Sequence, residues 1–247
     1  MKNLFSLEGH KALVTGANTG LGQAIAVGLA QAGAEVVCAA RRAPDETLAL
    51  IDKAGGRATA LALDFANPMA ATGVFAGAEF DILVNNAGII RRADAVHFSE
   101  ADWDAVMDVN LKALFFTTQA FAKELLAKGM SGKVVNIASL LSFQGGIRVP
   151  SYTAAKHGVV GVTKLLANEW ASKGINVNAV APGYIETNNT EALRADPERS
   201  KAILERIPAG RWGRSEDIAG ATVFLSSAAA NYIHGAVLNV DGGWLAR

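Results

Sequence analysis

Seven short apolar runs, separated by longer segments with helical patterning, are the feature that most constrains the fold of this chain. Each run is nearly continuous rather than alternating, which is typical of strands covered on both faces of a parallel sheet. Strands that alternate with helices predict right-handed βαβ units. We therefore expect an α/β fold, a doubly wound parallel sheet with helices on both faces. The runs cover residues 12–14, 35–40, 58–63, 82–84, 133–137, 176–180 and 236–240, and the main helical segments cover 21–31, 100–128 and 151–173.

Length and composition favour one compact domain over residues 1–247. Apolar residues make up 51% of the chain and charged residues 19%, which suits a packed core. The formal net charge is zero, so it points neither to nucleic acid nor to an anionic membrane surface. No apolar run approaches the roughly 20 residues that span a bilayer, and the N-terminal residues lack a signal peptide's apolar region. We expect a cytoplasmic protein that does not bind membranes.

Residues 187–214 interrupt the regular alternation of strands and helices. This stretch is polar, contains Pro197 and Pro208, and follows a predicted strand. Ligands in open α/β sheets bind beyond the carboxyl ends of the strands. We therefore expect a helical insertion that covers the substrate, the alternative being a plain surface excursion.

A glycine-rich turn follows the first apolar run. Glycines let the backbone turn sharply and approach a pyrophosphate, and the next helix offers unpaired N–H groups. The spacing is GxxxGxG, not the usual GxGxxG, so the position at the first strand–helix junction is what favours dinucleotide binding over a simple tight turn. This predicts a Rossmann-type sheet of about seven strands. The residues expected to contact the cofactor here are Gly16, Asn18, Thr19, Gly20, Leu21 and Gly22.

The end of the second run bears on the choice between NAD and NADP. A carboxylate there would bind the adenine ribose, whereas an arginine nearby could accommodate a 2′-phosphate. The sequence reads Ala40-Arg41-Arg42, which favours NADP unless both arginines are simply solvated charges. Asp64, after the third run, could accept a hydrogen bond from the adenine amino group, and we assign the adjacent Phe65 to the same pocket.

Tyr152 and Lys156 are four residues apart on a predicted helix and therefore share one face. A free phenol has a pKa near 10, too high for a general base, and a nearby ammonium stabilises the phenolate. Such a tyrosine can exchange the alcohol proton while a hydride moves to or from a nicotinamide. Ser139, which follows the run 133–137, could hold the substrate oxygen. The amide of Asn110 could bind a water that links Lys156 to solvent.

Together and in this order, these residues resemble the short-chain dehydrogenase/reductase family over nearly the whole chain. The motifs that carry the resemblance are Thr15-Gly16-Ala17-Asn18-Thr19-Gly20-Leu21-Gly22, Asn85-Asn86-Ala87-Gly88, Asn110, Ser139, Tyr152 with Lys156, Pro182-Gly183 and Asp241-Gly242-Gly243.

This resemblance implies an oxidoreductase that acts on a secondary alcohol or ketone, in the form of a homotetramer. Tyr152 would be the acid/base, Lys156 would lower its pKa and bind the nicotinamide ribose, and Ser139 would position the substrate. Asn110 would support the proton relay. The resemblance also implies cofactor contacts from Asn86, Ala87 and Gly88 on the adenosine side, and from Pro182, Gly183, Ile185 and Thr187 at the nicotinamide.

Substrate-side segments are similar to a narrower group, the 2-dehydro-3-deoxy-D-gluconate 5-dehydrogenases, also described as 2-deoxy-D-gluconate 3-dehydrogenases. The implied substrate is a six-carbon keto-deoxy sugar acid. Arg148, one helical turn before Tyr152, could clamp its carboxylate, with an ion pair or a subunit contact as the alternative. Arg91 and Arg92 are expected to be structural. The group is usually NAD-linked, which opposes the preference inferred from Arg41. The similar segments are 90–95, 142–152, 183–184, 187–190, 206–213 and 243–247.

Two alternatives remain open. One is another carbonyl reductase of the same family, such as a gluconate 5-dehydrogenase or a 3-ketoacyl reductase. The more remote one is a dinucleotide-sensing regulator without catalysis, against which the intact set of Ser139, Tyr152 and Lys156 argues. The four histidines show no ligand spacing, so we expect no catalytic metal.

Overall fold

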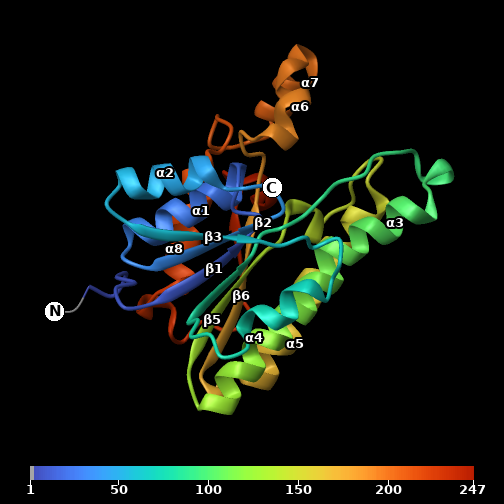
Figure 1. Cartoon of the computed structure of the whole chain (residues 1–247). Coiled ribbons are helices and arrows are strands. Elements are labelled where there is room, and N and C mark those ends of the chain that lie inside the picture. The colour runs from blue at the N-terminus through green and yellow to red at the C-terminus, as the bar shows by residue number, and fades with distance from the viewer. Residues whose placement is uncertain (1–2) are drawn as a thin grey trace.

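A seven-stranded parallel sheet forms the centre of the computed structural model, which describes residues 3–247 (Figure 1). The strand order is β3-β2-β1-β4-β5-β6-β7, and each pair of neighbours is parallel. The predicted doubly wound α/β sheet is therefore confirmed. The strands are β1 (Lys11–Thr15), β2 (Glu35–Ala40), β3 (Arg57–Ala62), β4 (Ile82–Asn85), β5 (Gly132–Ile137), β6 (Ile175–Pro182) and β7 (Val237–Val240).

Helices cover both faces of the sheet, with α1, α2 and α8 on one side and α3, α4 and α5 on the other (Figure 1). None of the helices in the described residues is long and apolar enough to cross a membrane. The helices are α1 (Gly20–Gln31), α2 (Asp45–Lys53), α3 (Glu100–Met107), α4 (Ala113–Lys128), α5 (Pro150–Trp170), α6 (Glu191–Ala195), α7 (Pro197–Leu204) and α8 (Ser215–Ser226).

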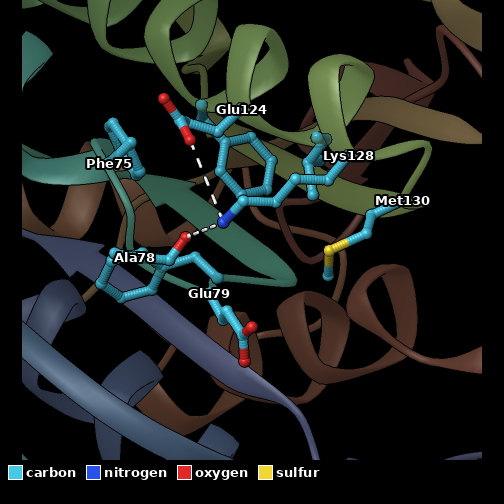
Figure 2. Close-up of a pocket in the computed structure, with 9 residues that line it drawn as sticks. Phe75, Ala78, Glu79, Glu124, Lys128 and Met130 are labelled. Carbon is cyan, nitrogen blue, oxygen red and sulfur yellow. Dashed lines mark hydrogen bonds and ion pairs between the residues drawn. The ribbon is translucent and has the colours of Figure 1, made fainter.

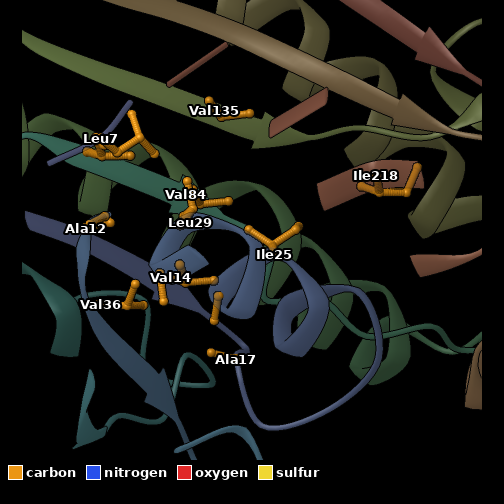
Figure 3. Close-up of a cluster of buried hydrophobic side chains, with 14 of the residues drawn as sticks. Leu7, Ala12, Val14, Ala17, Ile25, Leu29, Val36, Val84, Val135 and Ile218 are labelled. Atoms are coloured by element: carbon orange, nitrogen blue, oxygen red, sulfur yellow. The ribbon is translucent and has the colours of Figure 1, made fainter. Parts of the chain in front are cut away.

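Two separate apolar cores hold these layers together, because successive side chains of a strand point to opposite faces. On β1, Val14 packs toward α1 and α8, where it meets Ile25 and Ile218 (Figure 3). Leu13, one residue earlier, packs on the opposite side with residues of α4 and α5. Full burial of a side chain of this size contributes about 1.5–3 kcal/mol each, so the continuous apolar runs of the sequence are explained by burial on both faces.

The strand order reverses at β1, and this reversal places the ligand crevice. β1 pairs with β2 on one side and with β4 on the other, so the connections that leave these strands diverge. In open α/β sheets the ligand binds outside the carboxyl ends of the strands at this point. Thr15 at the end of β1 and Asn85 at the end of β4 mark that place in this chain.

Two predicted segments differ from expectation in informative ways. The segment 100–128, predicted as one helix, consists of α3 and α4 joined by a π-helical turn over Asp108–Lys112. Such turns are frequent at functional sites, and this one contains Asn110. The polar stretch 187–214 contains α6 and α7, which stand out beyond the sheet (Figure 1).

Candidate active site

The glycine turn is fastened to the end of β4 by a compact set of hydrogen bonds. The backbone N–H groups of Asn86 and Ala87 both donate to the Thr15 hydroxyl, each at 2.9 Å. The Asn86 amide donates in turn to the carbonyls of Thr15 (2.9 Å) and Gly16 (3.2 Å). Asn86 therefore holds the turn in shape from the neighbouring strand, a task that the sequence did not reveal.

Side chains are excluded from the turn by its own backbone. A Cβ atom at Gly22 would collide with the carbonyl oxygen of Gly16, and one at Gly16 would lie only 3.0 Å from the Ala87 Cα. Thr19, the N-cap of α1, makes no side-chain capping bond, and the first turn of α1 contains no acidic residue. The free N–H groups at this helix end suit a pyrophosphate, so the turn fits a dinucleotide.

Two arginines extend from the end of β2, on the side where an adenine ribose would lie. Arg41 and Arg42 are both exposed, and neither forms an ion pair within residues 3–247. Asp64 is also exposed, and its carboxylate accepts a hydrogen bond from the Ala66 N–H at 3.0 Å. Phe65 is buried. This edge can therefore offer uncompensated positive charge to a ligand.

Lys156 is buried against Tyr152 on α5, as the four-residue spacing predicts. Its Nζ lies 5.5 Å from the centroid of the Tyr152 ring and donates a 2.6 Å hydrogen bond to the Ile137 carbonyl at the end of β5. Burial lowers the pKa of Lys156 to about 8. The lysine is thus fixed beneath the phenol by the sheet.

The pKa of Tyr152 differs from our expectation. We expected Lys156 to lower it, but burial raises the pKa of Tyr152 above its ordinary value in this structure. A hydrogen bond with Ser139 and the positive charge of Arg92 act in the opposite direction without overcoming burial. The phenol therefore stays protonated here.

Ser139 lies directly after β5 and begins a short 3-10 turn, Leu140–Ser142. Its Oγ accepts a 3.2 Å hydrogen bond from the Leu141 N–H, which fixes the side chain at the end of the strand. Ser142 donates a 2.7 Å hydrogen bond to the carbonyl of Lys156. The Ser139 turn is therefore tied to α5, and the structure brings Ser139, Tyr152 and Lys156 together.

Asn110 has a different contact from the one we expected. Its amide both donates to the Ile89 carbonyl (2.9 Å) and accepts from the Ile89 N–H (2.8 Å). A Cβ at Gly88 would lie 3.4 Å from the Asn110 Oδ1. The buried amide thus holds the loop after β4, and its part in a proton relay stays a prediction.

The strap that we predicted to face the nicotinamide follows β6. Gly183 donates to the Val240 carbonyl at 2.9 Å, and Ile185 pairs with Gly213 in an isolated parallel bridge. Thr187 caps the turn Asn188–Thr190 that leads into α6. Ile185 and Thr187 are therefore placed by contacts with the segment before α8.

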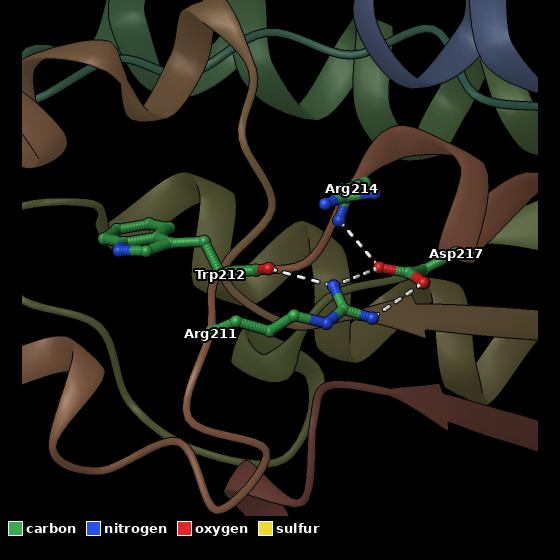
Figure 4. Close-up of polar contacts among 4 residues, drawn as sticks. All are labelled: Arg211, Trp212, Arg214 and Asp217. Carbon is green, nitrogen blue, oxygen red and sulfur yellow. Dashed lines mark hydrogen bonds and ion pairs between the residues drawn. The ribbon is translucent and has the colours of Figure 1, made fainter.

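That segment is anchored by an ion pair at the start of α8. Arg211 binds both carboxylate oxygens of Asp217, at 2.8 and 3.0 Å, and donates to the Trp212 carbonyl at 3.0 Å (Figure 4). The Arg214 N–H also donates to Asp217 at 2.7 Å. A single carboxylate thus fixes the backbone that supports Ile185.

Three arginines of the substrate-side segments, Arg91, Arg92 and Arg148, differ in their partners. Arg148 is not on α5 but precedes it, with a left-handed φ of 63°, and its guanidinium pairs with Asp94 at 3.1 Å. Our placement of Arg148 one helical turn before Tyr152 was therefore wrong, and the ion-pair alternative holds. Arg91 pairs with Asp102 at 3.2 Å, as a structural residue would.

Arg92 is the residue that sequence reasoning missed. It forms no ion pair within the described part of the chain, and its charge acts on the Tyr152 phenol. We had grouped it with Arg91 because adjacent arginines in a loop look alike in sequence. Only the positions of Asp94 and Asp102 show which arginines are neutralised.

A small pocket elsewhere does not compete with this site. Phe75, Phe121 and Met130 line it, and Lys128 spans its rim with a 3.1 Å hydrogen bond to the Ala78 carbonyl (Figure 2). The pocket is apolar and shares no residue with the Tyr152 region. It is a packing gap between α4 and the loop before β4.

Comparisons with known proteins agree over the full length of the chain. A family model described as enoyl-(acyl carrier protein) reductase, of the short-chain dehydrogenase type, matches residues 16–245. The chain is 56% identical to a 2-dehydro-3-deoxy-D-gluconate 5-dehydrogenase of Dickeya dadantii, covering 99% of both chains, and 57% identical to its namesake in Escherichia coli, covering 98% of both. A solved structure from Agrobacterium tumefaciens with bound NADP, provisionally named a 2-deoxy-D-gluconate 3-dehydrogenase, is 85% identical with a TM-score of 0.99 and full coverage of both chains.

Proposed function

This chain belongs to the short-chain dehydrogenase/reductase family and is an NAD(P)-dependent oxidoreductase, and we propose that its substrate is a keto-deoxy sugar acid of the 2-dehydro-3-deoxy-D-gluconate type. The proposal depends mainly on three groups that act together, the hydroxyls of Ser139 and Tyr152 and the guanidinium of Arg92. Ser139 and Arg92 both act to lower the pKa of the Tyr152 phenol, and Arg92 has no ion-pair partner within residues 3–247. A ketone and a carboxylate on one small molecule match these three groups. The names of the relatives support the same substrate class.

A nicotinamide dinucleotide bound at the glycine turn would supply or accept the hydride. The Tyr152 hydroxyl gives a proton to the substrate oxygen, or takes one from it, and the Ser139 hydroxyl orients that oxygen by a hydrogen bond. Lys156, held by the Ile137 carbonyl, keeps a cation under the phenol. Asn110 would support proton exchange from its place against Ile89.

We assign the substrate carboxylate to Arg92 in place of Arg148. Asp94 already pairs with the Arg148 guanidinium, which reduces the net positive charge that Arg148 offers to a second carboxylate. Arg92 has no such partner among residues 3–247, and charge-assisted hydrogen bonds to a carboxylate are about twice as strong as neutral ones. A carboxylate bound there would also reduce the positive charge at Tyr152, which favours the protonated phenol and hence reduction of a ketone.

We further propose NADP as the preferred cofactor. Arg41 and Arg42 lie where a 2′-phosphate would project and have no partner among residues 3–247 to neutralise them. NADP is bound in the 85% identical relative. Asp64 and Phe65 would contribute to the adenine pocket.

The remaining predictions from the sequence are part of the same proposal. The chain forms one domain over residues 1–247, residues 187–214 cover the substrate, and the protein works as a cytoplasmic homotetramer. Tyr152 and Lys156 would also contact the nicotinamide ribose, and Pro182, Gly183, Ile185 and Thr187 would face its ring.

Initial rates with NADPH and NADH against a panel of ketones test the proposal. The panel contains 2-keto-3-deoxy sugar acids, gluconate-type keto acids and acyl thioester ketones. We expect the highest kcat/KM with a keto-deoxy sugar acid and NADPH. A preference for acyl thioester ketones would instead select the ketoacyl reductase alternative, and nucleotide binding without turnover of any ketone would select a regulator.

A further inference from the structure

Residues 241–247 form a clasp against the base of α7 and the turn that follows Ser139. Trp244 is the centre of this clasp and is 4% exposed. It belongs to an apolar cluster with Leu140 of the Ser139 turn and with Ile203 and Ile207 at the base of α7. This cluster is separate from the two cores of the sheet. Its position between the insertion and the Ser139 turn suggests a task in the site itself.

The Trp244 side chain contacts three segments of the chain at once. The guanidinium carbon of Arg206 lies 4.0 Å from the indole centroid, a close cation–π contact at the end of the α7 segment. The Tyr184 ring, after β6, is 4.7 Å away between centroids. The indole N–H donates to the side-chain Oε1 of Gln144 at 3.4 Å, a long hydrogen bond to the loop after Ser139.

The backbone of the clasp is fixed independently of the indole. The two carboxylate oxygens of Asp241 accept hydrogen bonds from Gly243 and Leu245, each at 2.9 Å. The Gly242 carbonyl accepts from Ala209 at 2.9 Å. Arg247 donates to the Glu205 carbonyl at 2.8 Å. The segment is therefore attached to the α7 side at two further points, and Trp244 is presented from a rigid frame.

We propose that Trp244 is a positioning residue that holds the α6–α7 insertion and the Ser139 turn at a set distance and thereby shapes the substrate side of the site. The turn begins at Ser139, so a shift of Leu140 and Gln144 moves the hydroxyl that orients the substrate oxygen. The glycine turn at β1, which we assign to the pyrophosphate, makes none of these contacts, so we expect most of the nucleotide affinity to persist when the clasp is disturbed, although Tyr184 of the strap after β6 does contact Trp244. The identity of the substrate rests on the proposed function, but the mechanical link does not.

Hydrogen–deuterium exchange and steady-state kinetics of the full-length protein test this link together. Trp244→Ala removes all three contacts, Trp244→Phe removes only the indole N–H, and Arg206→Met removes only the cation. Lys201→Met is the matched control, because Lys201 lies on α7, is largely exposed and pairs only with Glu205 at 3.9 Å.

We expect Trp244→Ala to speed hydrogen exchange in residues 140–146 and in residues 191–207. We also expect it to raise KM for the sugar acid by about tenfold, a change of the size that corresponds to the loss of a strong cation–π contact. The dissociation constant for NADPH should change less than about twofold, because a loss of substrate positioning leaves nucleotide contacts intact. Arg206→Met should affect only 191–207 and Trp244→Phe only 140–146. Lys201→Met should match the unmodified protein in every readout.

Unchanged exchange in both segments of Trp244→Ala would overturn the proposal. So would a loss of NADPH affinity as large as the rise in KM, because that result describes general unfolding. If the unmodified protein fails to reduce any sugar acid, the proposed function fails, while the exchange rates still decide whether Trp244 links the two segments.

Discussion

At the scale of single residues, burial shifts the pKa values of Tyr152 and Lys156, the pair that we propose to be catalytic. It raises the pKa of Tyr152 and lowers that of Lys156 to about 8, so both groups are shifted toward their neutral forms. A protonated phenol beside Ser139 is ready to donate to a ketone oxygen. Arg92 has no ion-pair partner within residues 3–247, and we therefore assign the anionic substrate to it.

Replacing Arg92 should separate substrate binding from cofactor binding. For Arg92→Gln we expect KM for the sugar acid to rise by about 10- to 100-fold, since a hydrogen bond to a charged group contributes about 1.5–3 kcal/mol. Steady-state kinetics with Arg91→Gln and Arg148→Gln as matched controls should show less than about a threefold change, because both pairs are exposed. A larger rise in KM from Arg148→Gln than from Arg92→Gln would mean that Arg148 binds the substrate carboxylate.

The buried Lys156 predicts a specific dependence of stability on pH. Its pKa of about 8 lies below the ordinary 10.5, so the unfolded chain binds this proton more tightly. The destabilisation that comes from burying the protonated lysine is fully present below pH 8 and disappears as the pH rises toward 10.5. The unfolding free energy of the unmodified protein minus that of Lys156→Met should therefore rise by on the order of 3 kcal/mol between pH 7 and pH 10.5. Urea denaturation at a series of pH values measures this, and a flat difference would contradict a buried lysine.

At the scale of elements, the sequence predicted what local patterns determine. The seven strands and the glycine turn follow from continuous apolar runs and from backbone geometry that only glycine permits. The π turn around Asn110 was not predicted, because no glycine or proline marks an interruption within residues 100–128. The placement of Arg148 outside the helix could have been read from Pro150, because proline is typical of the first helical position, whereas the left-handed φ of Arg148 has no local signal.

The ion pair between Arg211 and Asp217 should contribute measurably to the stability of the strap after β6. Hydrogen bonds from Arg211 and from the Arg214 backbone hold the pKa of Asp217 below its usual range. The resulting stabilisation is present above the ordinary pKa of an aspartate and is lost as the pH falls through the lowered value. Asp217→Asn should lower the midpoint of thermal unfolding by a few degrees at pH 7.

Glu216→Gln, in the same first turn of α8, is the control for that change and should leave the midpoint within about one degree. Differential scanning calorimetry at pH 7 and near pH 4 distinguishes the two residues. If the difference in unfolding midpoint between Asp217→Asn and the unmodified protein grew as the pH fell, the ionised carboxylate of Asp217 would not be the source of the stabilisation.

At the scale of the whole molecule, the fold gathers distant residues at one edge of the sheet. Gly16, Asn86, Ser139 and Gly183 each follow a different strand, and all four lie at or just beyond the carboxyl ends of β1, β4, β5 and β6. The sequence predicted this meeting because parallel strands end on the same side. It could not show which loop charges are neutralised, because Asp94 and Asp102 reach their arginines only through tertiary contacts.

The preference for NADPH or NADH depends on residues at this edge of the sheet. Because a bound ligand stabilises the folded state, the preference should be measurable in the thermal stability of the whole chain. A ligand at 100 times its dissociation constant stabilises the folded state by about 2.7 kcal/mol, or several degrees at this length. NADPH should raise the unfolding midpoint more than NADH at equal concentration, and Arg41→Asp should reverse that order. A larger shift with NADH in the unmodified protein would refute the preference for NADP.

The most direct measurement of the central claim is the rate of Tyr152→Phe on the best ketone found, with NADPH affinity measured on the same sample. The phenol is the only group that this account assigns to proton transfer at the substrate oxygen. We predict unchanged nucleotide binding and a fall in kcat on the order of 100-fold or more. A variant that binds NADPH normally and retains the full rate would contradict a mechanism centred on Tyr152.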